Sequence, residues 1–155
     1  MRAKIACIGT IAGLSALSAP AHAVDVTIGA TLVNSCVLTL SSVGVMTPAS
    51  SGNVISTEES GGSAATLGVI AIGAFPTISF AAPSLTTSPA GWTGTPTNAI
   101  RYTSTGGASQ TYTSGSSSLT ASVLSESFTI HGRVTSSTGF AAGTYNLRTV
   151  ATCSQ

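Results

Sequence analysis

The chain has 155 residues, a length that suits one domain with a single hydrophobic core. Only 6% of the residues are charged, and the formal net charge is +1. Such a composition lacks the basic surface that nucleic-acid binding requires. It leaves solubility to hydroxyl and amide groups, as suits a packed assembly.

The first 23 residues have the features of a secretory signal peptide. Two cations precede an apolar run, residues 5–17, which is too short to span a bilayer as a helix. The sequence Ala-His-Ala then fits the pattern that signal peptidases cleave. We therefore predict that residues 1–23 are removed, that the mature chain begins at Val24, and that it is exported from the cytoplasm.

The mature chain keeps three cations (five minus two) and four anions, so its formal charge is −1. No apolar stretch after Val24 is long enough to cross a membrane, and no transmembrane segment is predicted. The sequence thus predicts a soluble or surface-assembled protein with no nucleic-acid partner.

The mature chain opens with strictly alternating apolar and polar residues, a pattern typical of a strand with one buried face. The apolar set is Val24, Val26, Ile28, Ala30 and Leu32, and the alternation continues in phase through Cys36, Leu38 and Leu40. Chain ends are usually polar and fray. A strand patterned from its first residue is therefore expected to pair, either within its own sheet or with another subunit.

Two cysteines remain after export, Cys36 and Cys153, and an oxidising compartment favours a disulfide between them. The bond would close a loop of 117 positions (153 minus 36) and contribute about 4 to 5 kcal/mol in the chain-entropy model. A zinc site would have to add His131 at no recognisable spacing, so no metal site is predicted.

Short alternating segments bounded by Gly, Pro and Ser clusters follow at intervals of roughly ten residues, and none has helical periodicity. This pattern predicts an all-β sandwich or barrel. Strands are expected at residues 66–75, 77–80, 100–104, 110–113, 124–134 and 145–153. A Gly-Gly hairpin would place Tyr102 opposite Tyr112. In the segment 124–134, Glu126 interrupts an apolar face.

Both ends of the mature chain resemble one family. At the N-terminal end the resemblance lies in Val26-Thr-Ile-Gly-Ala-Thr-Leu-Val-Asn-Ser-Cys36. At the C-terminal end it lies in Phe128-Thr-Ile-His-Gly-Arg-Val134, in Ala141-Ala-Gly-Thr-Tyr145, and in the alternating strand that follows. These segments resemble the pilin-like β-sandwich domains, which are similar to chaperone-usher fimbrial subunits.

The resemblance implies an immunoglobulin-like antiparallel β-sandwich that lacks its final strand and is completed by a donor strand from a neighbouring subunit. Residues 24–35 would be the donor segment, and residues 36–155 would be the pilin-like domain. The donor side chains would be Val24, Val26, Ile28, Ala30 and Leu32, and the acceptor groove would be lined by Tyr145, Leu147 and Ala151.

The resemblance also implies a function and partners. The protein would be a structural subunit of a pilus or fimbria, contributing to adhesion or biofilm at the cell surface or in an extracellular fibre. Its partners would be copies of the same chain, a periplasmic chaperone and an outer-membrane usher.

The residues leave two other function classes to weigh. Trp92, in the turn-dense stretch 83–98, could stack on a sugar ring, so the alternative is a monomeric secreted sandwich that binds carbohydrate or another surface ligand. An enzyme is not predicted, because the mature chain has one histidine, no lysine and no Gly-x-Ser-x-Gly motif. No cofactor is expected.

Overall fold

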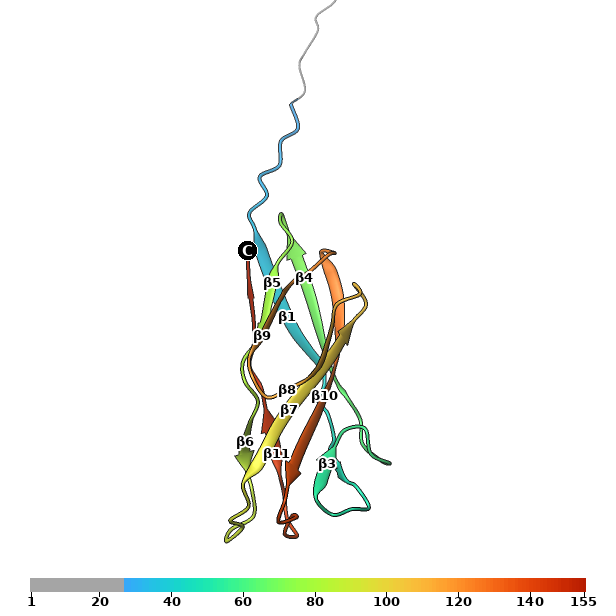
Figure 1. The fold of residues 1–155 in the computed structure, drawn as a ribbon. Coiled ribbons are helices and arrows are strands. Elements are labelled where there is room, and N and C mark those ends of the chain that lie inside the picture. Colours follow the sequence, from blue (N-terminus) through green and yellow to red (C-terminus); the bar gives the residue numbers. More distant parts are fainter. Residues whose placement is uncertain (1–26) are drawn as a thin grey trace, which may run out of the picture. The chain divides into compact units, whose positions relative to one another are not determined.

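The computed structural model describes residues 27–155 (Figure 1). In this range the chain forms twelve strands and no helix, and every strand pairing is antiparallel. Residues 31–155 make one compact unit. The all-β antiparallel sandwich expected from the sequence is therefore confirmed.

The larger sheet is built around the long strand β10. One edge of β10 pairs first with β4 and then with β3, and its other edge pairs with β7. Strand β1 extends the sheet beyond β4, β8 extends it beyond β7, and β2 pairs with β3. The bounds of these strands are β1 Ser35–Ser42, β2 Thr47–Pro48, β3 Val54–Ser56, β4 Ala65–Ile72, β7 Pro96–Ser104, β8 Ser109–Thr113 and β10 Ser125–Ser136.

The second layer contains the remaining five strands. β5 lies between β12 and β9, and β6 pairs with β11. Because the Ala81 amide donates to the Val150 carbonyl at 2.9 Å, the β5–β12 ladder leads directly into the β6–β11 ladder. The bounds are β5 Thr77–Phe80, β6 Ser84–Thr87, β9 Ser117–Thr120, β11 Asn146–Arg148 and β12 Ala151–Ser154.

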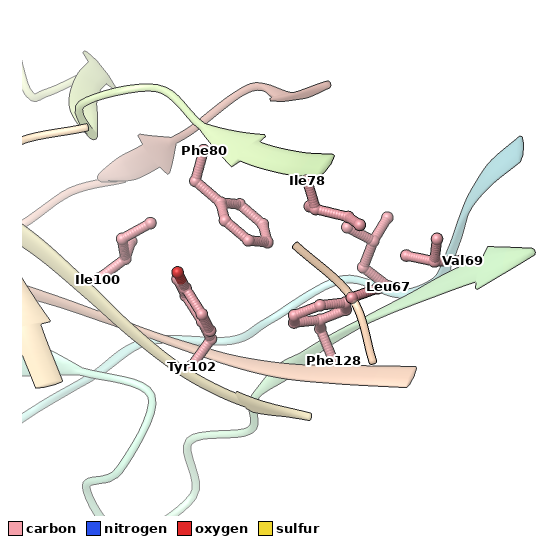
Figure 2. Close-up of a cluster of buried hydrophobic side chains, with 8 residues drawn as sticks. Leu67, Val69, Ile78, Phe80, Ile100, Tyr102 and Phe128 are labelled. Atoms are coloured by element: carbon pink, nitrogen blue, oxygen red, sulfur yellow. The ribbon is translucent and has the colours of Figure 1, made fainter. Parts of the chain in front are cut away.

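The hydrophobic core lies between the two layers and follows from the alternation along each strand. Figure 2 shows side chains of β5 pointing toward those of β4, β7 and β10. The ring of Phe80 lies 4.6 Å from Tyr102 and 5.8 Å from Phe128, measured between centroids. The buried hydroxyl of Tyr102 donates to Ser117 Oγ at 3.2 Å, so its polar end is satisfied. Burial of each large side chain stabilises the fold by about 1.5 to 3 kcal/mol.

Several local expectations need correction. Tyr102 pairs with Gln110 rather than with Tyr112, because the hairpin closes between Ser104 and Ala108 and the ladder continues from that turn in the same register. The expected strand 66–75 ends at Ile72, because the next residue, Gly73, has a left-handed φ of 97° that turns the chain. The expected strand 145–153 is divided into β11 and β12.

Candidate functional site: an open groove between two strand edges

Two strand edges face each other on one side of the sandwich. β1 uses one of its edges to pair with β4. β11 uses one edge to pair with β6, and β12 uses one edge to pair with β5. Within residues 27–155, no strand pairs with the opposite edge of β1, β11 or β12. These edges therefore present unpaired backbone N–H and C=O groups, which are the groups that strand addition uses.

The space between these edges is a groove, called here the edge groove. It has two adjoining parts of about 610 and 330 Å³, within the range of about 300 to 1,000 Å³ that ligand clefts occupy. The larger part is lined by residues that include Leu38, Leu40, Leu67, Phe80 and Ala151, the smaller part by Val45, Met46, Thr57, Gly132 and Tyr145, and both parts by Ala65, Ile130 and Leu147.

The floor of the edge groove belongs to the hydrophobic core. Leu67 and Phe80 are core residues that also line the groove. Leu38, Ile130 and Leu147 pack against the core but are only partly buried. The groove therefore leaves part of the hydrophobic core exposed, whereas the two layers cover the core elsewhere.

A disulfide joins the two groove edges near one end, as the sequence predicts. It links Cys36 of β1 to Cys153 of β12, with 6.1 Å between their Cα atoms. Each cysteine is two positions from a groove residue, Leu38 on β1 and Ala151 on β12, so it occupies the next position on the same face. The bond fixes the separation of the two edges at this end.

An aromatic cluster lies at the other end of the groove. Tyr145 lines the groove, and its ring centroid is 5.2 Å from that of Trp92 and 5.1 Å from that of Phe140. Trp92 stacks on Phe140 at 5.5 Å, and its Nε1–H donates to the Gly139 carbonyl at 3.1 Å. Gly94 lies so close to the indole that a Cβ would clash with it. These contacts make Trp92 the anchor between two loops.

The structure brings the three predicted acceptor residues together. Tyr145 lines the smaller part of the edge groove, Ala151 the larger part, and Leu147 both parts. The facing wall is formed by Leu38 and Leu40, which were not predicted as groove residues, although their alternation in phase with Cys36 was a usable signal.

The predicted donor residues fall into two groups. Val24 and Val26 lie outside the described residues. Ile28, Ala30 and Leu32 are exposed and belong to no strand, with Ile28 92% and Leu32 71% accessible. Large apolar side chains with this exposure are available for burial elsewhere.

A polar cluster away from the edge groove centres on Glu58. Its carboxylate accepts hydrogen bonds from the Arg101 guanidinium and from the Tyr112 hydroxyl, the latter at 2.6 Å. The guanidinium of Arg133 lies 4.0 Å from the centre of the Tyr112 ring. The hydrogen bond from Arg101, followed by that from Tyr112, lowers the pKa of Glu58 to about 2. The cluster ties the loop after β3 to β7 and β8.

Thr57 connects His131 to the edge groove. Its Oγ1 accepts the Gly132 amide at 3.1 Å and lies 3.0 Å from His131 Nδ1. A hydroxyl can accept two hydrogen bonds and donate one, so this contact suits either neutral tautomer of His131. Burial, with Arg101 adding to it, lowers the pKa of His131. Both effects favour the uncharged imidazole.

Comparisons with known proteins give no match, whether to a protein-family model, a curated protein or a solved structure. Over residues 27–155 the structure contains no helix with the length and apolar character needed to cross a membrane.

Proposed function

We propose that this protein is the structural subunit of a bacterial surface fibre, a pilus or fimbria, that polymerises by donor-strand complementation and contributes to adhesion or biofilm. The observation that carries the proposal is the edge groove, an apolar channel between two unpaired strand edges. The N-terminal segment of another copy would enter it as the missing strand of an immunoglobulin-like sandwich.

The segment and the groove agree in length. Val24 to Leu32 is nine residues (32 − 24 + 1), about 26 Å when extended. The facing side of the groove, from Leu38 on β1 to Met46 beyond the end of that strand, is also nine residues (46 − 38 + 1). Five apolar side chains on one face of the donor would therefore meet successive positions along the groove.

Burial of the exposed donor side chains supplies the driving force. Ile28 and Leu32 are mostly exposed, and covering each side chain is worth about 1.5 to 3 kcal/mol. Each backbone hydrogen bond formed to a groove edge adds about 0.5 to 1.5 kcal/mol. The sum favours a long-lived complex between subunits.

The same surfaces account for the proposed partners. An apolar groove between unpaired edges promotes aggregation until it is filled. A periplasmic chaperone that covers the groove and an outer-membrane usher that exchanges it for a donor strand would control the order of events. The disulfide is consistent with export into an oxidising compartment.

The test compares two neighbouring substitutions on opposite faces of the donor segment. Ile28→Asp places a charge on the apolar face, and Thr27→Asp places it on the polar face. The purified proteins are run on non-reducing gels with and without boiling, and are imaged by negative-stain microscopy. Ladders that only boiling removes, and filaments, should be retained by Thr27→Asp and lost by Ile28→Asp. Equal behaviour of the two variants, or a wild-type protein that stays monomeric, contradicts the proposal.

The sequence also left open a carbohydrate-binding monomer that uses Trp92. The contacts of this ring with Phe140, Tyr145 and the Gly139 carbonyl give it a packing role, and they do not favour that alternative.

A further inference from the structure

The domain has two opposite ends, seen at the top and bottom of the sandwich in Figure 1. The disulfide pole contains the start of β1, the turn 73–76 and the C-terminus. The aromatic pole contains the loops 88–95 and 137–145, which carry the Trp92–Phe140–Tyr145 cluster. β10 connects the poles, because its first residue pairs with Ile70 near the end of β4 and its last with Pro96 at the start of β7.

The connection between donor segment and domain is short. Only three residues, Val33 to Ser35, separate the last apolar donor residue, Leu32, from Cys36. The Cα atoms of Leu32 and Cys36 can therefore be at most about 14 Å apart. A donor strand bound in a neighbour brings the disulfide pole of its own domain close to the point where it leaves the neighbour's groove.

Open-ended growth of the fibre determines at which pole of the neighbour the donor strand leaves the groove. Each donor segment joins its own domain at the disulfide pole. If it also left the neighbour's groove at the disulfide pole, two copies would meet at like poles and close into a reciprocal dimer. A fibre therefore requires the donor to leave at the aromatic pole, beside Tyr145, and to run parallel to β1 and antiparallel to β11 and β12.

The disulfide pole presents an exposed aromatic side chain beside the connection. Phe75 is 56% exposed and follows Gly73, which packs against Asn34 so closely that a Cβ would clash with its side chain. The Gln155 side chain donates to the Ala74 carbonyl at 2.6 Å. The turn carrying Phe75 is thus held next to the residues that link the donor to β1.

We infer that each disulfide pole docks on the aromatic pole of the next copy, with Phe75 contacting the Trp92–Phe140–Tyr145 cluster. The inference rests on the proposed donor-strand function and adds a second, non-covalent surface to it. An exposed phenylalanine and a partly exposed aromatic cluster are complementary, because aromatic rings pair through stacked and edge-to-face contacts. The contact would limit the angle between successive subunits and stiffen the fibre.

Trp92 is the only tryptophan in the chain, so its fluorescence reports on this contact. Three states are compared: a monomer lacking residues 24–32, the same monomer with a synthetic peptide of residues 24–33, and the polymer. The peptide fills the groove without bringing a neighbouring pole. We expect Trp92 emission to shift to shorter wavelength, and acrylamide quenching to fall, in the polymer beyond the values of the peptide-filled monomer.

Two substitutions identify the surface. Phe75→Ser should keep the boiling-sensitive ladders but lose the additional protection of Trp92. Val37→Ser is the control, because Val37 is equally exposed at 56% but lies on β1 and outside the turn at the pole. It should behave like the wild type.

The possible outcomes distinguish failure of the pole docking from failure of the proposed donor-strand function. Wild-type ladders with Trp92 quenched as in the peptide-filled monomer, or full protection in Phe75→Ser polymers, overturn the docking and leave donor-strand exchange standing. A wild-type protein that forms no ladders removes both.

Discussion

Substitution of the buried Glu126 by an apolar residue is expected to stabilise the domain. Glu126 is 4% exposed, and neither carboxylate oxygen has a hydrogen-bond partner within the described part of the chain. It lies on the same face of β10 as Phe128, at the end of the core beside Gly106. Replacing a buried, unpartnered polar group by an apolar group of similar shape removes the cost of its desolvation.

Glu126→Met should therefore raise the free energy of unfolding by about 1 to 3 kcal/mol. For a domain of this size the gain corresponds to an increase in Tm of roughly 4 to 11 °C. The assay is urea unfolding followed by circular dichroism, with Tm from calorimetry. Glu59→Met is the matched control, because Glu59 is more accessible than Glu126, and its substitution should change stability by less than about 0.5 kcal/mol. Destabilisation of Glu126→Met by more than about 1 kcal/mol would refute the reasoning, since it would mean that the carboxylate is compensated.

Three further predictions concern the disulfide and the titrating groups. Replacing Cys36 and Cys153 together by Ala should lower stability by up to about 5 kcal/mol, from the 117-residue separation, measured by urea unfolding. Arg101→Ala should raise the pKa of Glu58 from about 2 toward 4.5, as measured by NMR titration. In the wild type the ionised Glu58 carboxylate stabilises the fold above pH 4.5, and this contribution is lost as the pH falls toward 2. Because the folded pKa of His131 lies below 6.5, stability should decline as pH falls below 6.5, and His131→Gln should remove this step in the urea midpoints between pH 7.5 and 5.

The sequence predicted the sandwich because its main signals are local. Alternation in β4 and β10 places Leu67 and Phe128 on one face, and this pattern needs no knowledge of partner strands. The disulfide was predictable because the predicted removal of residues 1–23 leaves only Cys36 and Cys153 to pair.

Features that depend on pairing between distant strands were not predictable in the same way. The ladder between β7 and β8 is centred on Gly106, whereas a pair of Tyr102 with Tyr112 requires a turn centred on Gly107, and the two adjacent glycines do not show which centre the chain adopts. The facing walls of the edge groove come from Leu38 and Leu147, which are separated by most of the domain and meet only when both layers have formed. Alternation marks Glu126 as an interruption but does not show that its oxygens lack partners.

Under the proposed function, the short connection also explains why a subunit cannot fill its own groove with a donor strand parallel to β1. A donor parallel to β1 must place Leu32 at the Tyr145 end of the groove, about eight residue steps, or 26 Å, from the Leu38 end. Within one chain, Leu32 is tied to Cys36 by three residues that reach at most about 14 Å. The parallel orientation therefore cannot be reached within the same chain. The same three residues that bring the poles of two subunits together prevent the groove from being filled in this direction by its own N-terminal segment.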